Sequence, residues 1–418
     1  MTEGEFLGSD TRKNDPNSMP QHWLNKAIAY VDQMRSPESE FHYRLHSMTE
    51  PTIFASCFAL FFQHLCGETK TWGEGTRTSW LDYLQGFQEK ETGLFRDPYS
   101  VARVTDSSHD ILHLDWQLTG FCLGALHALR AEPLYPLNYV ALWCDAQYMQ
   151  KWLDRLDWSR ASNSGNKAMF IAIMLAHELE RGNTAALEGL NVWLDWHDAH
   201  ADPVTGYWCT TRNGRYFQGM TGFVHQFLVY NYLGRRVRFP ERVIDRTLLL
   251  QQPDGLFSPA LGGGACDDLD AIHTLCHMYH TENYRRETIK AALNKALEGV
   301  LANQNPDGGF SWARRHRFSA VDWLKVAFHN ARSADPYLVY LSLRHAFSAQ
   351  RQLKTKLETG WSAVGRDWSQ SSLWDTWFRT LAVAEIETVL FPAVATQWWR
   401  RLDTPNFGWF YLPQGCES

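Results

Sequence analysis

Apolar residues recur at helical spacing along most of the chain, and two kinds of predicted helix alternate. One kind is amphipathic, as in residues 80–88, and the other is almost entirely apolar, as in residues 52–62. An amphipathic helix covers a core from one side, whereas an apolar helix must be buried all round. The alternation predicts an all-α fold, an α/α toroid of about six helical hairpins with an outer and an inner ring.

A short turn recurs between these helices. It reads Gln-Pro-Asp-Gly-Leu-Phe at 252–257 and Gln-Asn-Pro-Asp-Gly-Gly-Phe at 304–310, and looser copies surround Gly93 and Gly206. The spacing indicates a repeat of about 50 to 56 residues with one degenerate copy. No linker interrupts it, so we expect one toroid domain over residues 21–418, preceded by a polar, disordered segment at 1–20.

Polar residues gather at the starts of the apolar helices. In a toroid these starts converge on one end of the central cavity, so residues far apart in the sequence can share one mouth. The candidates for this mouth are Asp106, His109, Asn166, Gln218, Asp268, Asp270, Asp335 and Asp375.

The most unusual stretch runs from Gly262 to His280. A glycine-rich loop leads directly into a helix whose start carries Asp267, Asp268 and Asp270. One acidic residue at a helix start is ordinary capping, because the helix dipole favours negative charge there. Three acids facing a cavity would repel one another and raise at least one pKa, which would produce a general acid.

The turns and the Asp268-x-Asp270 motif resemble those of the terpenoid cyclases and the protein prenyltransferase β subunits. The turns are similar to the QW-type repeats of triterpene cyclases, and the resemblance implies that Asp270 protonates an alkene or epoxide. The fourth position of the cyclase motif is Ala271 rather than aspartate. Where a prenyltransferase would hold zinc with cysteine and histidine, this chain has Asp270 and Asp375.

This resemblance gives the main hypothesis, a cyclase- or isomerase-type enzyme that acts on an apolar isoprenoid-like substrate in an aromatic cavity. The chain contains 19 tryptophans, enough to line such a cavity as well as to pack a core. The candidate catalytic residues are Asp270, Asp268, His273, Asp375 and His109. The candidate substrate-binding residues are Trp116, Trp208, Trp374, Trp377, Asp115 and His225.

Two alternatives stay open. The first is a carbohydrate-active toroid, a polysaccharide lyase, glycoside hydrolase or epimerase, with an acid–base pair drawn from His109, His113 and Asp115. Residues 314–317, Arg-Arg-His-Arg, would suit an anionic sugar. The second is a toroid that binds a ligand without catalysis.

Cofactors are not required by any of these hypotheses. Zinc could bind the histidine pairs His109/His113 and His273/His277, which lie one helical turn apart, and magnesium could bind Asp268 and Asp270.

Composition limits the possible partners and the location. The net charge is −6 and no basic block occurs, which argues against nucleic acid, and no run of about 20 apolar residues could span a membrane. The eight cysteines include no Cys-x-x-Cys pair. We therefore expect a cytoplasmic protein with a small-molecule substrate, and the sequence leaves the oligomeric state open.

Overall fold

The computed structural model describes residues 22–97, 111–208, 216–259, 261–314, 319–332, 335–350, 356–357 and 359–400. In this part of the chain almost all regular structure is helical. The strands β1 (Lys356–Leu357) and β2 (Arg366–Asp367) form a small antiparallel pair. None of the described helices is long and apolar enough to cross a membrane. The expected segment 1–20 lies outside the described residues.

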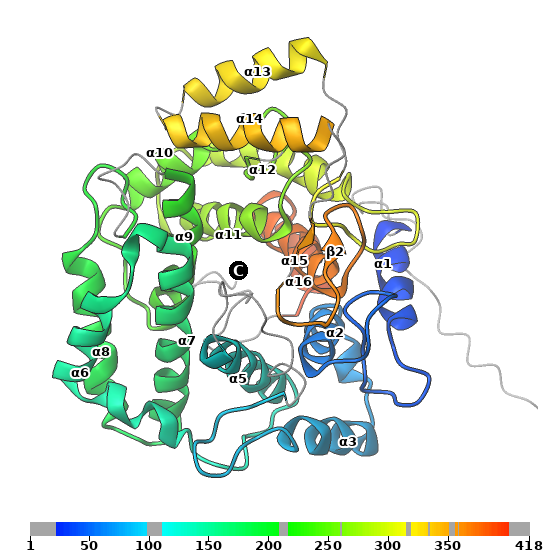
Figure 1. Cartoon of the computed structure of the whole chain (residues 1–418), viewed down its shortest axis with the longest axis vertical. Coiled ribbons are helices and arrows are strands. Elements are labelled where there is room, and N and C mark those ends of the chain that lie inside the picture. Colours follow the sequence, from blue (N-terminus) through cyan, green and yellow to red (C-terminus); the bar gives the residue numbers. More distant parts are fainter. Residues whose placement is uncertain are drawn as a thin grey trace, which may run out of the picture.

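Six helices form a closed inner ring, which confirms the predicted α/α toroid (Figure 1). Each packs against the next, and the last packs against the first. They are nearly continuous apolar segments, as helices enclosed on all sides must be. In chain order they are α2 (Ile53–Leu65), α5 (Ile111–Ala128), α7 (Ala161–Glu180), α9 (Tyr216–Tyr232), α11 (Ala265–Thr281) and α15 (Leu373–Leu390).

Amphipathic helices lie outside this ring. In α12 (Arg286–Leu301), for example, Ile289, Leu293 and Leu297 are buried at helical spacing while charged residues face outwards. The other outer helices are α1 (His22–Gln33), α3 (Glu74–Gln85), α6 (Ala146–Arg155), α8 (Ala186–Ala199), α10 (Pro240–Leu249) and α16 (Pro392–Trp398). Short 3-10 helices, η2 (Glu68–Lys70), η3 (Asn138–Cys144) and η4 (Trp158–Arg160), complete this layer.

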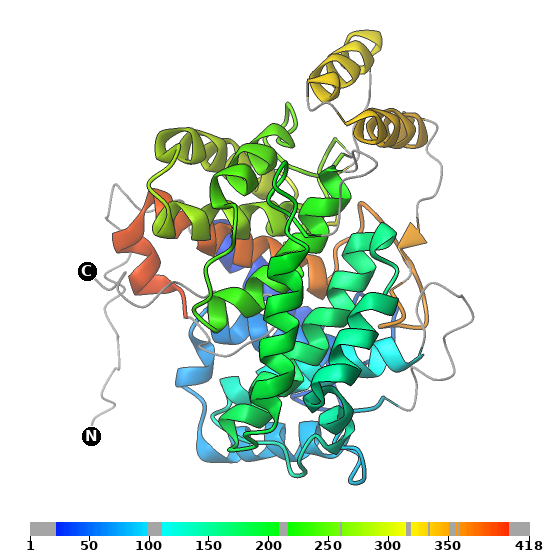
Figure 2. The same cartoon turned by 90° about the vertical axis from the view of Figure 1, so that its left-hand side faces the viewer.

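A helical hairpin projects from the toroid. It consists of α13 (Ala320–Ala331) and α14 (Pro336–Gln350), which pack mainly on each other (Figure 2). A small apolar cluster, built on Val326 and Ala346, lies between the two helices.

The repeated turn has the same structural role in the copies that contain a glutamine. The Nε2 group of Gln251 donates one hydrogen bond to the carbonyl of Gly255 in its own turn and another to the carbonyl of Ala292 in the next outer helix. The amide thereby attaches each hairpin to its neighbour. Gln88 bonds in the same way to Gly93 and Tyr135.

The last copy of the turn closes the ring. Gln304 donates to the carbonyls of Gly308 and Trp23, so the turn is attached to α1, the first helix of the chain. Gly308 has φ of +94°, and a Cβ atom there would lie 2.3 Å from the carbonyl oxygen of Lys26. This turn therefore requires glycine both for its backbone conformation and for its close approach to α1.

Candidate functional site

The inward face of α11 carries Asp270, His273 and His277. These residues are three and four positions apart and so lie on one side of the helix. His273 contacts Asn231 of α9 and Glu385 of α15, the two inner helices that flank α11. This face of α11 therefore points towards the interior of the ring.

Asp268 has a structural role instead. One carboxylate oxygen accepts the N–H groups of Phe257 and Ser258, and the other accepts that of Gly264. Arg379 of α15 lies 2.8 Å from the second oxygen, and both side chains are 1% exposed. Asp268 thus fixes the start of α11 to the preceding turn and to α15.

Asp375 is used in a similar way at the start of α15. Arg366 of β2 donates to its Oδ2 atom from Nε at 3.0 Å and from Nη2 at 2.8 Å. Ser372, the N-cap of α15, also donates to this oxygen. Asp375 therefore joins the β1–β2 segment to the inner ring.

Asp270 differs from both of these carboxylates. It is 3% exposed, and its side chain forms no hydrogen bond or ion pair with the described residues. Burial, with smaller contributions from Asp267 and Asp268, raises the pKa of Asp270 well above its usual value. The protonated form, which a general acid requires, is therefore favoured to higher pH than in an ordinary aspartate.

The imidazole of His273 contacts one carboxylate and one amide side chain. Its Nδ1 lies 2.8 Å from Oε1 of Glu385, and its Nε2 lies 3.4 Å from Nδ2 of Asn231. Because the amide nitrogen is a donor, we assign the proton of the imidazole to Nδ1. Burial raises the pKa of Glu385, and His273 opposes this effect.

A polar network lies at the starts of α5 and α7, at the mouth of the ring. The Oδ1 atom of Asn166 accepts hydrogen bonds from His113 at 2.7 Å and from Gln117 at 3.2 Å. Trp361 donates its indole N–H to Gln117 at 3.0 Å. The Nδ2 group of Asn166 has no partner among the described residues, so its two N–H groups are available to a ligand.

His225 of α9 reaches the same region. It is 4% exposed, and burial, followed by the nearby His113, lowers its pKa to about 3. The helices α5 and α9, which carry His113 and His225, both pack against α7 in the inner ring. His225 is therefore a neutral imidazole at physiological pH.

The four tryptophans named from the sequence do not share one wall. Trp374 and Trp377 pack against Phe58 in the interior, and the ring of Trp374 lies 4.4 Å from that of Trp361. Trp116 packs outwards against residues of η3 and α6. Trp208 packs between α8 and α9.

Asp115, another predicted residue, is engaged elsewhere. Asp115 is buried and pairs with Arg96 at 3.0 Å. His109 and Asp106 lie outside the described residues, as do positions 315–317 of the arginine-rich run. In the described part of the chain no three His, Cys, Asp or Glu side chains come together as metal ligands.

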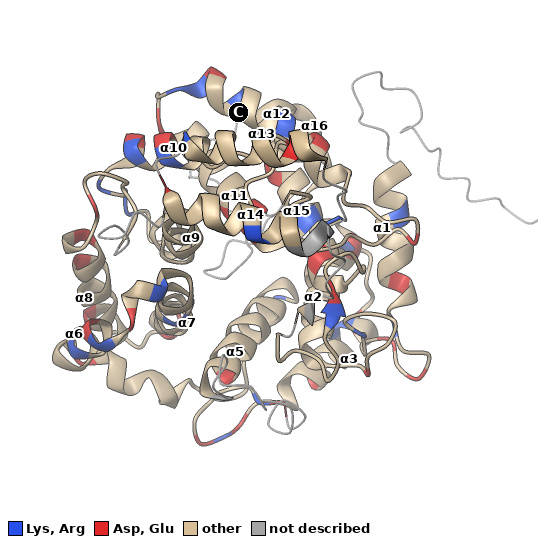
Figure 3. Cartoon of the chain, turned by 45° about the horizontal axis from the view of Figure 1, so that its top comes forward, with Lys and Arg blue, Asp and Glu red and all other residues tan. Residues whose placement is uncertain are grey.

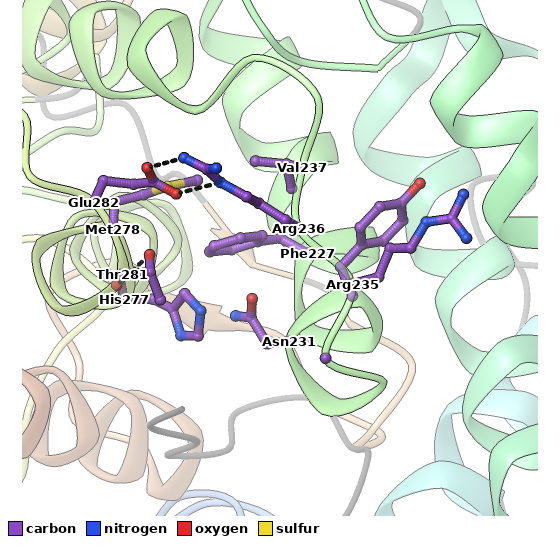
Figure 4. Close-up of a pocket in the computed structure, with 11 residues that line it drawn as sticks. Phe227, Asn231, Arg235, Arg236, Val237, His277, Met278, Thr281 and Glu282 are labelled. Atoms are coloured by element: carbon purple, nitrogen blue, oxygen red, sulfur yellow. Dashed lines mark hydrogen bonds and ion pairs between the residues drawn. The ribbon is translucent and has the colours of Figure 1, made fainter. Parts of the chain in front are cut away.

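A pocket of about 520 Å³ opens at the other end of the ring, between the ends of α9 and α11. Figure 4 shows Asn231 and His277 projecting towards each other from these two helices. At the rim, Glu282 holds Arg236 through two hydrogen bonds of 3.1 and 2.6 Å. Since Asn231 also contacts His273, the pocket lies next to the inward face of α11.

Sequence reasoning missed Glu385, Arg379, Arg366, Asn231 and Trp361. Glu385 and Arg379 had a usable signal, because each is a charged residue within the otherwise apolar α15, where a buried charge needs a partner. Arg366, Asn231 and Trp361 stand in segments with no comparable pattern.

Comparison with known proteins gives little further information. No family model and no curated protein matches the chain. A solved structure of a polysaccharide lyase is similar with a TM-score of 0.47 and 11% identity, covering 89% of this chain and 98% of that one. At this identity and score, the similarity carries no information about the reaction.

Proposed function

We propose that the chain is an enzyme that acts on carbohydrate by general acid–base catalysis inside the toroid, with Asp270 as the acid and His225 as the base. The observation that carries this proposal is the pair of opposite pKa shifts. Burial favours the protonated form of Asp270 and the neutral form of His225, on the neighbouring helices α11 and α9. Buried titratable groups with strongly shifted pKa values cluster at functional sites.

The site suits a sugar that carries a carboxyl group. His225 would remove the proton on the carbon next to the carboxyl group, and Asn166 would donate its free N–H groups to the carboxylate as charge develops there. Asp270 would protonate the departing glycosidic oxygen, so a carbon–carbon double bond forms as the carbon–oxygen bond breaks. Return of the proton to the opposite face, without loss of oxygen, would be an epimerisation.

The polar lining favours carbohydrate over an isoprenoid substrate. A protonated Asp270 would also suit a terpenoid cyclase, but a carbocation needs surroundings without nucleophiles. Here His113, His225 and Gln117 carry nitrogen and oxygen atoms at the mouth. Trp374 and Trp377 are largely covered by their packing neighbours, at 3% and 1% exposed. The terpenoid hypothesis therefore ranks second.

Assays of the purified full chain test this proposal. Polygalacturonate, alginate and hyaluronan would serve as acidic polymers, and dextran as a neutral one, with ultraviolet absorbance reporting the unsaturated product and NMR reporting epimerisation. We expect turnover of an acidic polymer and its loss in Asp270→Asn, His225→Gln and Asn166→Ala. Asp195→Asn, an exposed substitution on α8, is the control. Full activity in Asp270→Asn would overturn the assignment of the acid.

A further inference from the structure

The α13–α14 hairpin is attached beside the mouth of the toroid. Asp335, which is buried at the start of α14, accepts the N–H of Tyr216, the first residue of α9, at 2.8 Å. It also accepts the N–H groups of Tyr337 and Leu338 at 3.0 Å. One carboxylate thus caps α14 and α9 together and fixes α14 to the end of the ring where the inner helices begin.

The other end of α14 is close to the segment that completes the mouth. The rings of His345 and Trp368 are 5.2 Å apart. Trp368 follows β2 in the same segment as Trp361, whose indole bonds to Gln117 in the polar network. The helix therefore extends along the rim, from the start of α9 to the segment that reaches Asn166 through Gln117.

One exposed face of α14 carries both aromatic and cationic side chains. Tyr340, Arg344 and Phe347 stand four and three residues apart, so they follow one side of the helix over about 10 Å. Tyr340 is 56% and Phe347 is 48% exposed, and Arg344 is exposed and forms no ion pair with the described residues. The opposite side, with Leu338 and Ala346, is buried.

We propose that this face, Tyr340, Arg344 and Phe347, binds an anionic polysaccharide outside the mouth while one of its sugars occupies the site at Asp270. Aromatic rings offer flat apolar surfaces to the C–H faces of sugars, and a guanidinium pairs with a carboxylate through two hydrogen bonds. The inference rests on the proposed function and adds to it that the substrate is a charged polymer rather than a small glycoside.

Charge supports this partner. The chain has a net charge of −6, yet the exposed charged residues of the hairpin are the cations Lys325, Arg332 and Arg344. Asp335 is buried in its caps, and Asp322 is engaged in the capping box of α13. Figure 3 shows the basic positions on these helices. A polyanion is therefore attracted to the hairpin although the whole chain would repel it.

Affinity electrophoresis of the full chain tests the inference separately from catalysis. Gels containing polygalacturonate, alginate or hyaluronan should retard the protein, and dextran should not. Tyr340→Ala and Arg344→Ala should each weaken binding by about fivefold or more, and added salt should reduce it further. The matched control is Leu324→Ala on α13, which is also exposed and should behave as the wild type.

Kinetics and mass measurements complete the test. On a cleavable polymer, the α14 variants should raise KM while leaving turnover of a trisaccharide unchanged. Retardation without any product would leave the α14 surface standing and reject the proposed chemistry. Absence of retardation by all three acidic polymers, or equal retardation of the Arg344→Ala variant, would overturn the inference. So would light scattering that shows a dimer dispersed by Tyr340→Ala, because a second copy would then occupy this face.

Discussion

The guanidinium Nη1 of Arg379 lies 2.8 Å from the Oδ2 atom of Asp268, and both side chains are 1% exposed. This ion pair separates the roles of two aspartates that are only two residues apart. Positions two apart on a helix point in nearly opposite directions. Asp268 therefore faces the turn and α15, and Asp270 faces the interior without a partner among the residues that the structure describes.

We predict that Asp268→Asn strongly destabilises the fold. The substitution preserves the shape of the side chain but leaves Arg379 as a buried, uncompensated charge, which costs roughly 3–5 kcal/mol. Urea unfolding followed by circular dichroism measures the effect. The control is Asp32→Asn, whose partner Arg35 is 38% exposed and whose own side chain is 55% exposed. A surface pair of this kind contributes about 0–1 kcal/mol, so equal losses in the two variants would contradict the structural role of Asp268.

A pair of glycines tests the closure of the ring. Gly308 and Gly182 have nearly the same φ, +94° and +93°, but a Cβ at Gly308 would lie 2.3 Å from the Lys26 carbonyl while a Cβ at Gly182 would meet nothing within 4 Å. Alanine at either position destabilises the fold by about 1–2 kcal/mol, because a residue with a Cβ is strained in the left-handed backbone conformation. We predict that Gly308→Ala is destabilised beyond that value, since the turn must also move away from α1. Identical unfolding midpoints for the two variants would show that this contact does not hold the ring closed.

The architecture could be predicted because it depends on patterns of residues that are close together in the sequence. The alternation of amphipathic and apolar helices and the repeated Gln-turn-Gly-aromatic segment each depend on residues close together in the sequence. The turn at Gly308 carries the same signal as the turn at Gly255, and both have positive φ. These features predicted the toroid without knowledge of any contact between distant residues.

The site was less predictable because its distinctions depend on contacts across the ring. In the sequence, Asp268 and Asp270 belong to one acidic cluster. Their roles differ because Asp268 pairs with Arg379, which lies 111 residues further along the chain. Trp116 and Trp374 look alike in sequence, yet one packs outwards and the other inwards. The bond between His273 and Glu385 spans 112 residues. A helical pattern shows that a residue is buried, but it does not show which neighbour it meets.

We predict that Asp270→Asn becomes more stable relative to the wild type as the pH rises from 4 towards 7. An unfolded aspartate loses its proton near pH 3.9, whereas the buried Asp270 keeps it, so the native state binds one more proton above that pH. Its folded pKa is raised, so the stability of the wild type falls with rising pH, by up to about 1.4 kcal/mol per pH unit. Asparagine does not titrate, so the stability of the variant lacks this fall with rising pH.

Urea unfolding of both proteins at several pH values between 4 and 7 measures the difference. Asp195→Asn is the control, since its side chain is 71% exposed and its substitution should leave the pH dependence of stability as in the wild type. Parallel stability curves for Asp270→Asn and the wild type would mean that Asp270 is ionised in the folded protein.

The pH dependence of kcat/KM tests the acid and the base together. A base must be unprotonated, so the lowered pKa of His225, about 3, keeps the enzyme active well below pH 6.5, where an ordinary imidazole would become protonated. An acid must be protonated, so the raised pKa of Asp270 moves the alkaline limb upwards. Because the nearby His113 lowers the pKa of His225, His113→Gln should shift the acid limb towards higher pH. An acid limb that stays near 6.5 in the wild type and does not move in His113→Gln would exclude His225 as the base.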